Sequence, residues 1–152
     1  MGGDRGSDEE RIRALICAYA ERLDAGDFDG VATLFADGVF RSARGGEPLV
    51  GRDAVRGQYD PVVVYDDGTP RTKHLLGNIE VECDPTNGTA AARCTFTVLQ
   101  AVAGGPLHAV LAGRYHDRFT RVDREWHFAE RVVLPDLLGD LTGHMRSGRS
   151  DG

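Results

Sequence analysis

Four consecutive strand-like segments in the second half of the chain constrain its fold most. All four are rich in Val, Thr, Phe, Leu and Tyr, residues that favour extended backbone. They span residues 72–83, 90–101, 107–122 and 125–134. Turn-forming residues separate them, at Asp84–Gly88, Gly104–Pro106 and Asp123–Arg124. Long strands joined by such short turns pair in sequence order, so this half predicts an antiparallel meander.

The first half predicts helices instead. Ser7 or Asp8 is suited to cap a helix, and the apolar residues that follow recur at helical spacing until Gly26. These residues are Ile12, Leu15, Ile16, Tyr19 and Leu23. A second short helix is expected after Asp27, a brief strand at Val39–Phe40, and a third helix from Gly51 to about Asp60. Helices followed by strands predict an α+β fold. We expect a strongly curved antiparallel sheet that closes with three N-terminal helices into a cone with a deep apolar pocket.

The chain of 152 residues fits one domain, which we place at residues 8–135. Residues 1–7 are expected to be a flexible N-terminus, and residues 136–152 a C-terminal tail that is partly flexible, above all from residue 143. The stretch 61–70 has a central Gly and bounding prolines, and it is either a mobile lid or an ordinary surface loop.

Composition excludes several functions. The net charge is −6, which makes nucleic-acid binding a poor expectation. No run approaches eighteen apolar residues, so we expect no membrane span and a cytoplasmic location. The three cysteines, Cys17, Cys83 and Cys94, lack metal spacing and are interpreted as reduced core residues. The chain contains no common nucleotide, zinc-protease or serine-hydrolase motif, and we expect neither a metal nor a cofactor.

Four polar residues at apolar, inward-facing positions are the candidates for chemistry. Asp24 ends the first helix, His74 begins the first long strand, Tyr19 lies on the apolar helix face, and Arg131 lies on the last strand. A histidine can take and return a proton near neutral pH, and a carboxylate on its other nitrogen fixes its tautomer. Tyr19 and Arg131 are suited to stabilise a developing oxyanion. Each residue also has an ordinary structural interpretation, as a core or surface side chain.

Strand alternation alone leaves the direction of His74 open. Alternation groups His74 with Leu76 and Asn78, whereas a bulge at Gly77 would reset the register. The other histidines are weaker candidates. His108, His116 and His127 lie on strands rich in Arg and Asp, and His144 lies in the tail.

The segment from Ile12 to Asp37 resembles the opening of SnoaL-like proteins of the nuclear transport factor 2-like superfamily. Further matches are Gly51–Val55, Thr72–Asn78, Gly113–Asp117 and Trp126–Arg131. The resemblance covers roughly residues 8–135 and implies a curved sheet, three helices and a deep pocket, usually in a dimer formed through the sheet. It is nearest to the branch of scytalone dehydratase, hexachlorocyclohexane dehydrochlorinase and bile-acid dehydratases.

In that branch a helix aspartate pairs with a strand histidine that acts as the base, and the resemblance assigns these roles to Asp24 and His74. Tyr19 matches a tyrosine of the dehydratases and Arg131 a pocket arginine of the dehydrochlorinase type. Two features depart from the pattern. Thr97 is the one stand-in for a polar residue on the second long strand, and a second pocket histidine has no clear equivalent.

These observations predict a cofactor-independent lyase or isomerase that abstracts a proton from an apolar, oxygenated polyketide, terpenoid or steroid-like ring. The expected lining residues are Phe35, Phe40, Tyr59, Tyr65, Phe96, Thr97, Leu111 and Phe128. Two alternatives stay open. One is a polyketide-cyclase type of enzyme, and the other is a non-catalytic module that binds a ligand or a partner.

Overall fold

A computed structural model describes residues 5–146. The ends predicted to be flexible fall partly outside this range, at residues 1–4 and 147–152. Three helices and six strands follow one another along the chain. They are α1 (Arg5–Asp24), α2 (Phe28–Thr33), β1 (Val39–Ser42), β2 (Leu49–Val50), α3 (Gly51–Gly57), β3 (Thr72–Asp84), β4 (Thr89–Gln100), β5 (His108–Val122) and β6 (Glu125–Leu138).

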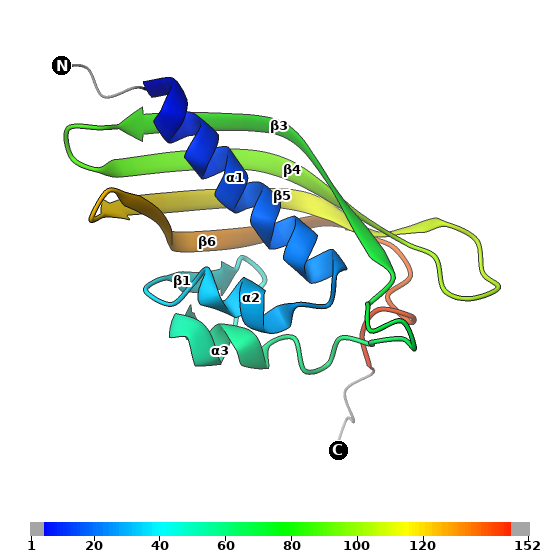
Figure 1. Cartoon of the computed structure of the whole chain (residues 1–152). Coiled ribbons are helices and arrows are strands. Elements are labelled where there is room, and N and C mark those ends of the chain that lie inside the picture. Colours follow the sequence, from blue (N-terminus) through cyan, green and yellow to red (C-terminus); the bar gives the residue numbers. More distant parts are fainter. Residues whose placement is uncertain (1–4, 147–152) are drawn as a thin grey trace.

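The six strands form one sheet in the order β2-β1-β6-β5-β4-β3. Strands β3 to β6 pair antiparallel in sequence order, which confirms the predicted meander. The sheet is mixed rather than wholly antiparallel, because β1 pairs with β6 in parallel. In Figure 1 the long helix α1 crosses one face of the curved sheet, and α2 and α3 lie beside β1. The α+β fold with three helices on a curved sheet is thus as expected.

Local sequence explains where the helices end. The α1 helix ends at Asp24, and Gly26 then adopts a positive φ of 75°, a conformation that glycine reaches at low cost. The side chain of Asp27 accepts a hydrogen bond from the Gly30 N–H at 2.9 Å and caps α2, as predicted. Asp8 does not cap α1, because the helix begins earlier and the Asp8 carboxylate accepts a hydrogen bond from Trp126 Nε1 at 3.0 Å.

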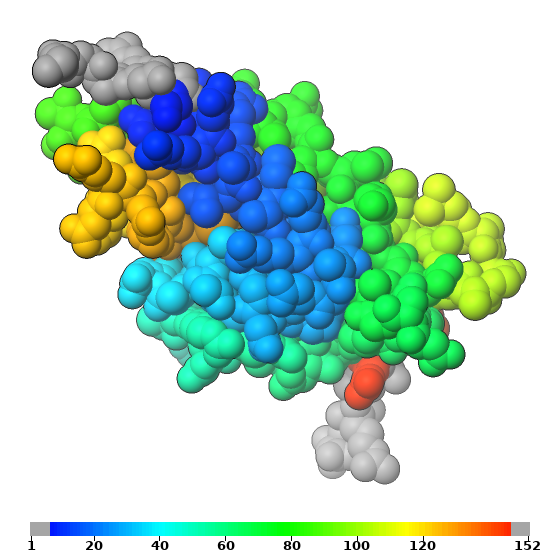
Figure 2. Space-filling view, viewed as in Figure 1, coloured from blue at the N-terminus to red at the C-terminus, as the bar shows by residue number. Residues whose placement is uncertain are grey.

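Aromatic side chains fill the space between α1 and the sheet. The ring of Phe35 stacks on that of Phe128, with ring centres 4.8 Å apart. The ring of Phe119 also packs against Phe128, with ring centres 4.7 Å apart. The space-filling view shows α1, α2 and α3 covering this core (Figure 2). No helix among residues 5–146 has the length and apolar character needed to span a bilayer.

The C-terminal segment is ordered further than predicted. Strand β6 continues to Leu138, and the residues up to Arg146 pack against the loop that precedes β3. Val62 forms an isolated antiparallel bridge with Met145, and Arg146 N–H donates to the Pro61 carbonyl at 2.8 Å. Backbone hydrogen bonds thus tie residues 144–146, which the sequence analysis assigned to the tail, to the loop before β3.

Candidate active site

The carboxylate of Asp24 lies where the end of α1 meets the start of β3. It accepts three hydrogen bonds from β3: from His74 Nδ1 at 2.6 Å, from the His74 backbone N–H at 2.8 Å, and from Thr72 Oγ1 at 2.9 Å. Burial raises the pKa of Asp24, but the hydrogen bonds and charge of His74 and the hydroxyl of Thr72 outweigh it and lower the pKa overall. Asp24 is therefore an ionised carboxylate in a fixed position.

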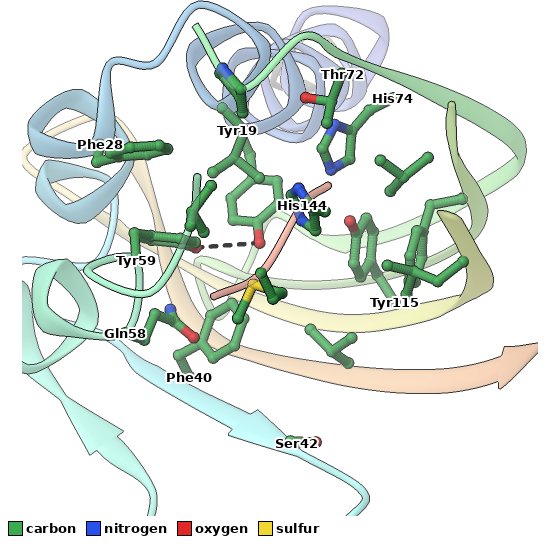
Figure 3. A pocket seen from close by; sticks show the side chains of 18 residues that line it. Tyr19, Phe28, Phe40, Ser42, Gln58, Tyr59, Thr72, His74, Tyr115 and His144 are labelled. Carbon is green, nitrogen blue, oxygen red and sulfur yellow. Dashed lines mark hydrogen bonds between the residues drawn. The ribbon is translucent and has the colours of Figure 1, made fainter. Parts of the chain in front are cut away.

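This contact orients the imidazole of His74. Because Nδ1 is bound to Asp24, Nε2 is the ring nitrogen left for other partners. The side chain of His74 is 7% exposed and lines a partly open cavity (Figure 3). The register of β3 shifts between Gly77 and Glu80, and Asn78 has a positive φ of 51°. The bulge considered from the sequence is present, and His74 faces the helices.

The cavity has a volume of about 300 Å³, at the small end for a ligand site. Its walls come from both halves of the chain and are mainly apolar and aromatic. The residues that line it are Tyr19, Leu23, Phe28, Phe40, Ser42, Gln58, Tyr59, Val62, Pro70, Thr72, His74, Phe96, Val98, Leu111, Tyr115, Val133, His144 and Met145. None of these side chains is a carboxylate, a lysine or an arginine.

Three phenols, of Tyr19, Tyr59 and Tyr115, belong to the polar part of the wall. The hydroxyls of Tyr19 and Tyr59 lie 3.2 Å apart, and Tyr115 packs edge-on against Tyr19 with ring centres 5.7 Å apart. Burial raises the pKa of Tyr19 and raises those of Tyr59 and Tyr115 well above the usual range. All three are thus neutral donors. One hydroxyl of the Tyr19–Tyr59 pair donates to the other, which leaves one O–H proton to donate into the cavity.

Arg131 does not reach the cavity, contrary to the sequence expectation. Its side chain is fully buried and binds Asp117 through two hydrogen bonds, of 2.7 and 2.8 Å. Its guanidinium carbon lies 4.2 Å from the ring centre of Tyr19 and 3.8 Å from that of Tyr115. Both tyrosines line the cavity, whereas Arg131 does not.

Four of the eight predicted lining residues reach the cavity: Phe40, Tyr59, Phe96 and Leu111. The other four do not. Phe35 and Phe128 are buried in the aromatic core, where they stack on each other. Tyr65 lies in the loop before β3, and its hydroxyl donates to the Gly143 carbonyl. Thr97 lies on the opposite face of β4 from Phe96 and Val98, so it cannot act as the polar residue of the second strand.

Sequence reasoning missed several polar residues of the wall, Tyr115 and His144 among them. Tyr115 lies on β5, where alternate residues from Gly113 to Phe119 are buried, and that alternation was a signal for it. His144 comes from the C-terminal segment and supplies a second cavity histidine (Figure 3). The glycine-containing segment around it has no periodic pattern that would have indicated its position.

The described residues contain no group of three His, Cys, Asp or Glu side chains that is suited to hold a metal ion. What the cavity offers is an oriented imidazole, neutral phenols and an apolar wall. This combination can move a proton and hydrogen-bond an uncharged oxygen.

The fold and this cavity place the chain among the nuclear transport factor 2-like proteins with a cystatin-like fold. A SnoaL-like domain model matches residues 4–132, and the chain belongs to that family. It is 25% identical to a nuclear transport factor 2-like protein from Novosphingobium aromaticivorans, with a TM-score of 0.70 over 85% of this chain and 82% of that one.

Two further solved structures are similar. A protein of unknown function from Mycobacterium tuberculosis is 28% identical, with a TM-score of 0.72 over 89% of this chain and 75% of that one. A protein provisionally named a scytalone dehydratase, from Novosphingobium aromaticivorans, is 22% identical, with a TM-score of 0.70 over 95% and 96% of the two chains. No curated protein matches the chain.

Proposed function

We propose that this protein is a lyase or isomerase that abstracts a proton next to a carbonyl group of a small, largely apolar substrate, without a cofactor. The observation that carries the proposal is the 2.6 Å contact between Asp24 and His74 Nδ1 at the wall of a mainly apolar cavity. Asp24 is a positioning residue, because it holds the ring and stabilises the imidazolium that forms. His74 is the proposed base.

The proposed elimination begins and ends with the same neutral imidazole. Nε2 of His74 takes the proton from the carbon next to the carbonyl, and the C–H electron pair forms an enolate. The phenol pair Tyr19–Tyr59 or the Tyr115 hydroxyl donates a hydrogen bond to the enolate oxygen. The enolate collapses to a double bond as the bond from the next carbon to its hydroxyl breaks. The hydroxide then takes the proton from His74 and leaves as water.

Isomerisation or ring closure would share the proton abstraction and differ only in the fate of the enolate. A polyketide-cyclase activity is therefore a variant of the same proposal. A purely ligand-binding role would need no oriented base. The contact of Asp24 with His74, in a cavity that Tyr19 also lines, favours the enzyme.

The first test detects proton abstraction whatever the later steps are. α-Tetralone, a bicyclic ketone, is incubated with the protein in D₂O, and loss of the α-proton signal is followed by NMR. We expect catalysed exchange that falls by roughly 10²- to 10⁴-fold in His74→Ala. His116→Ala is the matched control, since His116 is exposed.

The second test asks whether the reaction is an elimination. The substrate is α-tetralone with a hydroxyl group on the carbon β to its carbonyl. Loss of water from it gives a ketone that tautomerises to α-naphthol, whose fluorescence reports turnover. Exchange and elimination that are equally fast in the wild type and in His74→Ala would refute the proposed base. Catalysis of neither reaction by the wild type would refute the proposed function for bicyclic ketones.

A further inference from the structure

The C-terminal segment completes the cavity wall. Its backbone pairs with the loop before β3, because the Val63 N–H donates to the His144 carbonyl at 2.9 Å and Val62 bridges to Met145. Val62, His144 and Met145 all line the cavity. One side of the binding site is therefore built by two segments from distant parts of the sequence that are hydrogen-bonded to each other.

Two buried or half-buried side chains fix the residue that precedes His144. The carbonyl of Gly143 accepts hydrogen bonds from the Tyr65 hydroxyl at 2.5 Å and from Gln100 Nε2 at 2.9 Å. Gln100 is 1% exposed and also donates to the Pro70 carbonyl at 2.9 Å. These contacts hold the backbone at Gly143, so the direction of the His144 side chain is set by the fold.

The imidazole of His144 has polar capacity that the protein does not use. Its Nδ1 atom is buried and has no hydrogen-bond partner among the described residues, although the ring lines the cavity. A buried polar atom without a partner costs roughly 1–3 kcal/mol, so such atoms are normally satisfied by water or a ligand. Figure 3 shows the ring in the part of the cavity that His74 and Tyr115 also face.

The state of this ring restricts what it can bind. Burial lowers the pKa of His144, and His74 lowers it further when His74 is protonated, so the ring of His144 is neutral at neutral pH. A neutral imidazole donates from one nitrogen and accepts at the other, which suits a hydroxyl or carbonyl oxygen. The buried guanidinium of Arg131 is held by Asp117 and does not line the cavity. Among residues 5–146, the lining thus offers no fixed cation to a carboxylate or a phosphate.

We propose that His144 is a substrate-binding residue that hydrogen-bonds a hydroxyl or carbonyl oxygen, and that the site selects uncharged oxygenated rings over their anionic analogues. The inference deepens the proposed function, since it names the class of compound that the same cavity takes. It can be tested by binding alone, without turnover.

The experiment measures the affinities of α-naphthol and α-naphthoate by isothermal titration calorimetry near pH 7. The two probes share a ring system and differ in charge. We expect naphthol to bind at least tenfold more tightly than naphthoate. In His144→Phe, which keeps an aromatic ring but no polar atom, naphthol should bind roughly five- to tenfold more weakly, the effect of one lost neutral hydrogen bond.

A second variant distinguishes the loss of a hydrogen bond from a change in folding. His144→Asn places an amide near the position of Nδ1, and we expect naphthol affinity within about threefold of the wild type. His116→Phe is the control for the loss of a histidine outside the cavity, and urea unfolding checks that each variant is folded. An unchanged affinity in His144→Phe, equal or tighter binding of naphthoate, or no binding of naphthol to the wild type would overturn the inference.

The two proposals fail in different ways. If naphthol binding depends on His144 while His74→Ala exchanges α-protons as fast as the wild type, the binding inference stands and the proposed catalysis falls. If His74→Ala loses exchange while His144→Phe binds naphthol normally, the catalysis stands and the role of His144 falls.

Discussion

The guanidinium carbon of Arg131 lies 3.8 Å from the ring centre of Tyr115, which lines the cavity although Arg131 itself does not. Burial opposes the charge on Arg131, but the charge and hydrogen bonds of Asp117 raise its pKa overall, so the cation persists. Its charge also acts on the buried phenols, where it lowers the pKa of Tyr19 against the larger effect of burial. Arg131 thus strengthens Tyr19 as a hydrogen-bond donor.

Removing the partner of Arg131 should destabilise the fold strongly. Asp117 and Arg131 are directly opposite each other on β5 and β6, and both side chains are fully buried. In Asp117→Asn the cation loses its counter-charge, so we expect the free energy of unfolding to fall by about 3–5 kcal/mol. Urea denaturation measures the change.

The matched control is the exposed pair of Arg114 and Asp136 on the same two strands. Asp136→Asn should leave the free energy of unfolding nearly unchanged, because solvent screens an exposed pair. Similar effects of the two substitutions would contradict the assignment of Asp117 as the essential counter-charge.

Replacing the carboxylate that orients His74 should impair catalysis more than binding. In Asp24→Asn the amide can still contact the ring, but it does not stabilise an imidazolium and can favour the other tautomer. We expect the rate of α-tetralone exchange to fall by roughly 10²- to 10⁴-fold, while the affinity for α-naphthol changes less than threefold. NMR exchange and calorimetry give the two numbers.

Glu21→Gln changes an exposed residue on the same helix and should alter neither the rate of α-tetralone exchange nor the affinity for α-naphthol. Thr72→Val removes one of the three hydrogen bonds to Asp24, and we expect a smaller loss of rate than in Asp24→Asn. Full activity in Asp24→Asn would mean that the carboxylate has only a structural role.

The turn after α1 should tolerate no side chain at Gly26. The residue has a positive φ of 75°, which costs an L-residue roughly 1–2 kcal/mol, and an added Cβ would collide with the Gly68 carbonyl. We expect Gly26→Ala to lower the free energy of unfolding by at least that amount and to slow α-tetralone exchange, because the turn follows Asp24 directly. Gly45→Ala is the control. Gly45 also has a positive φ but nothing lies near its Cβ position, so only the backbone penalty should appear.

Local patterns in the sequence predicted most of the elements, β2 being the exception, but not how side chains from different elements pack against one another. Helical spacing predicted α1, and alternation with turn residues predicted the meander. Alternation also placed Arg131 on the inward face correctly. It could not show that Arg131 packs on the rings of Tyr19 and Tyr115 without lining the cavity itself, because that depends on side chains from α1 and β5.

The position of His144 was beyond any local pattern. The hydrogen bonds that place it join Gly143 to Tyr65 and Gln100, which are 78 and 43 residues away in the sequence. The parallel pairing of β1 with β6 also joins segments that are far apart in the sequence, so no local pattern indicated it. Thr97 is different. The alternation of Phe96, Val98 and Gln100 already indicated that Thr97 faces outward, so closer attention to that pattern would have excluded it.

His144 should also give the fold a pH dependence of predictable sign. Its pKa in the folded protein is lowered, mainly by burial and further by the charge of His74, below the value of about 6.5 for an exposed histidine. The unfolded chain therefore binds a proton at a higher pH than the folded protein does. The contribution of His144 to stability is complete above about pH 6.5 and is lost as the pH falls toward the folded pKa.

The comparison of wild type with His144→Asn isolates this contribution from the carboxylates that titrate at lower pH. We expect the free energy of unfolding of the wild type to decline more steeply than that of the variant between about pH 6.5 and 5, as measured by urea denaturation at several pH values. His116→Asn, at an exposed position, should keep the wild-type slope. Parallel curves for wild type and His144→Asn would show that the imidazole is equally protonated in both states, and hence that it is not the buried, neutral group that the cavity geometry requires.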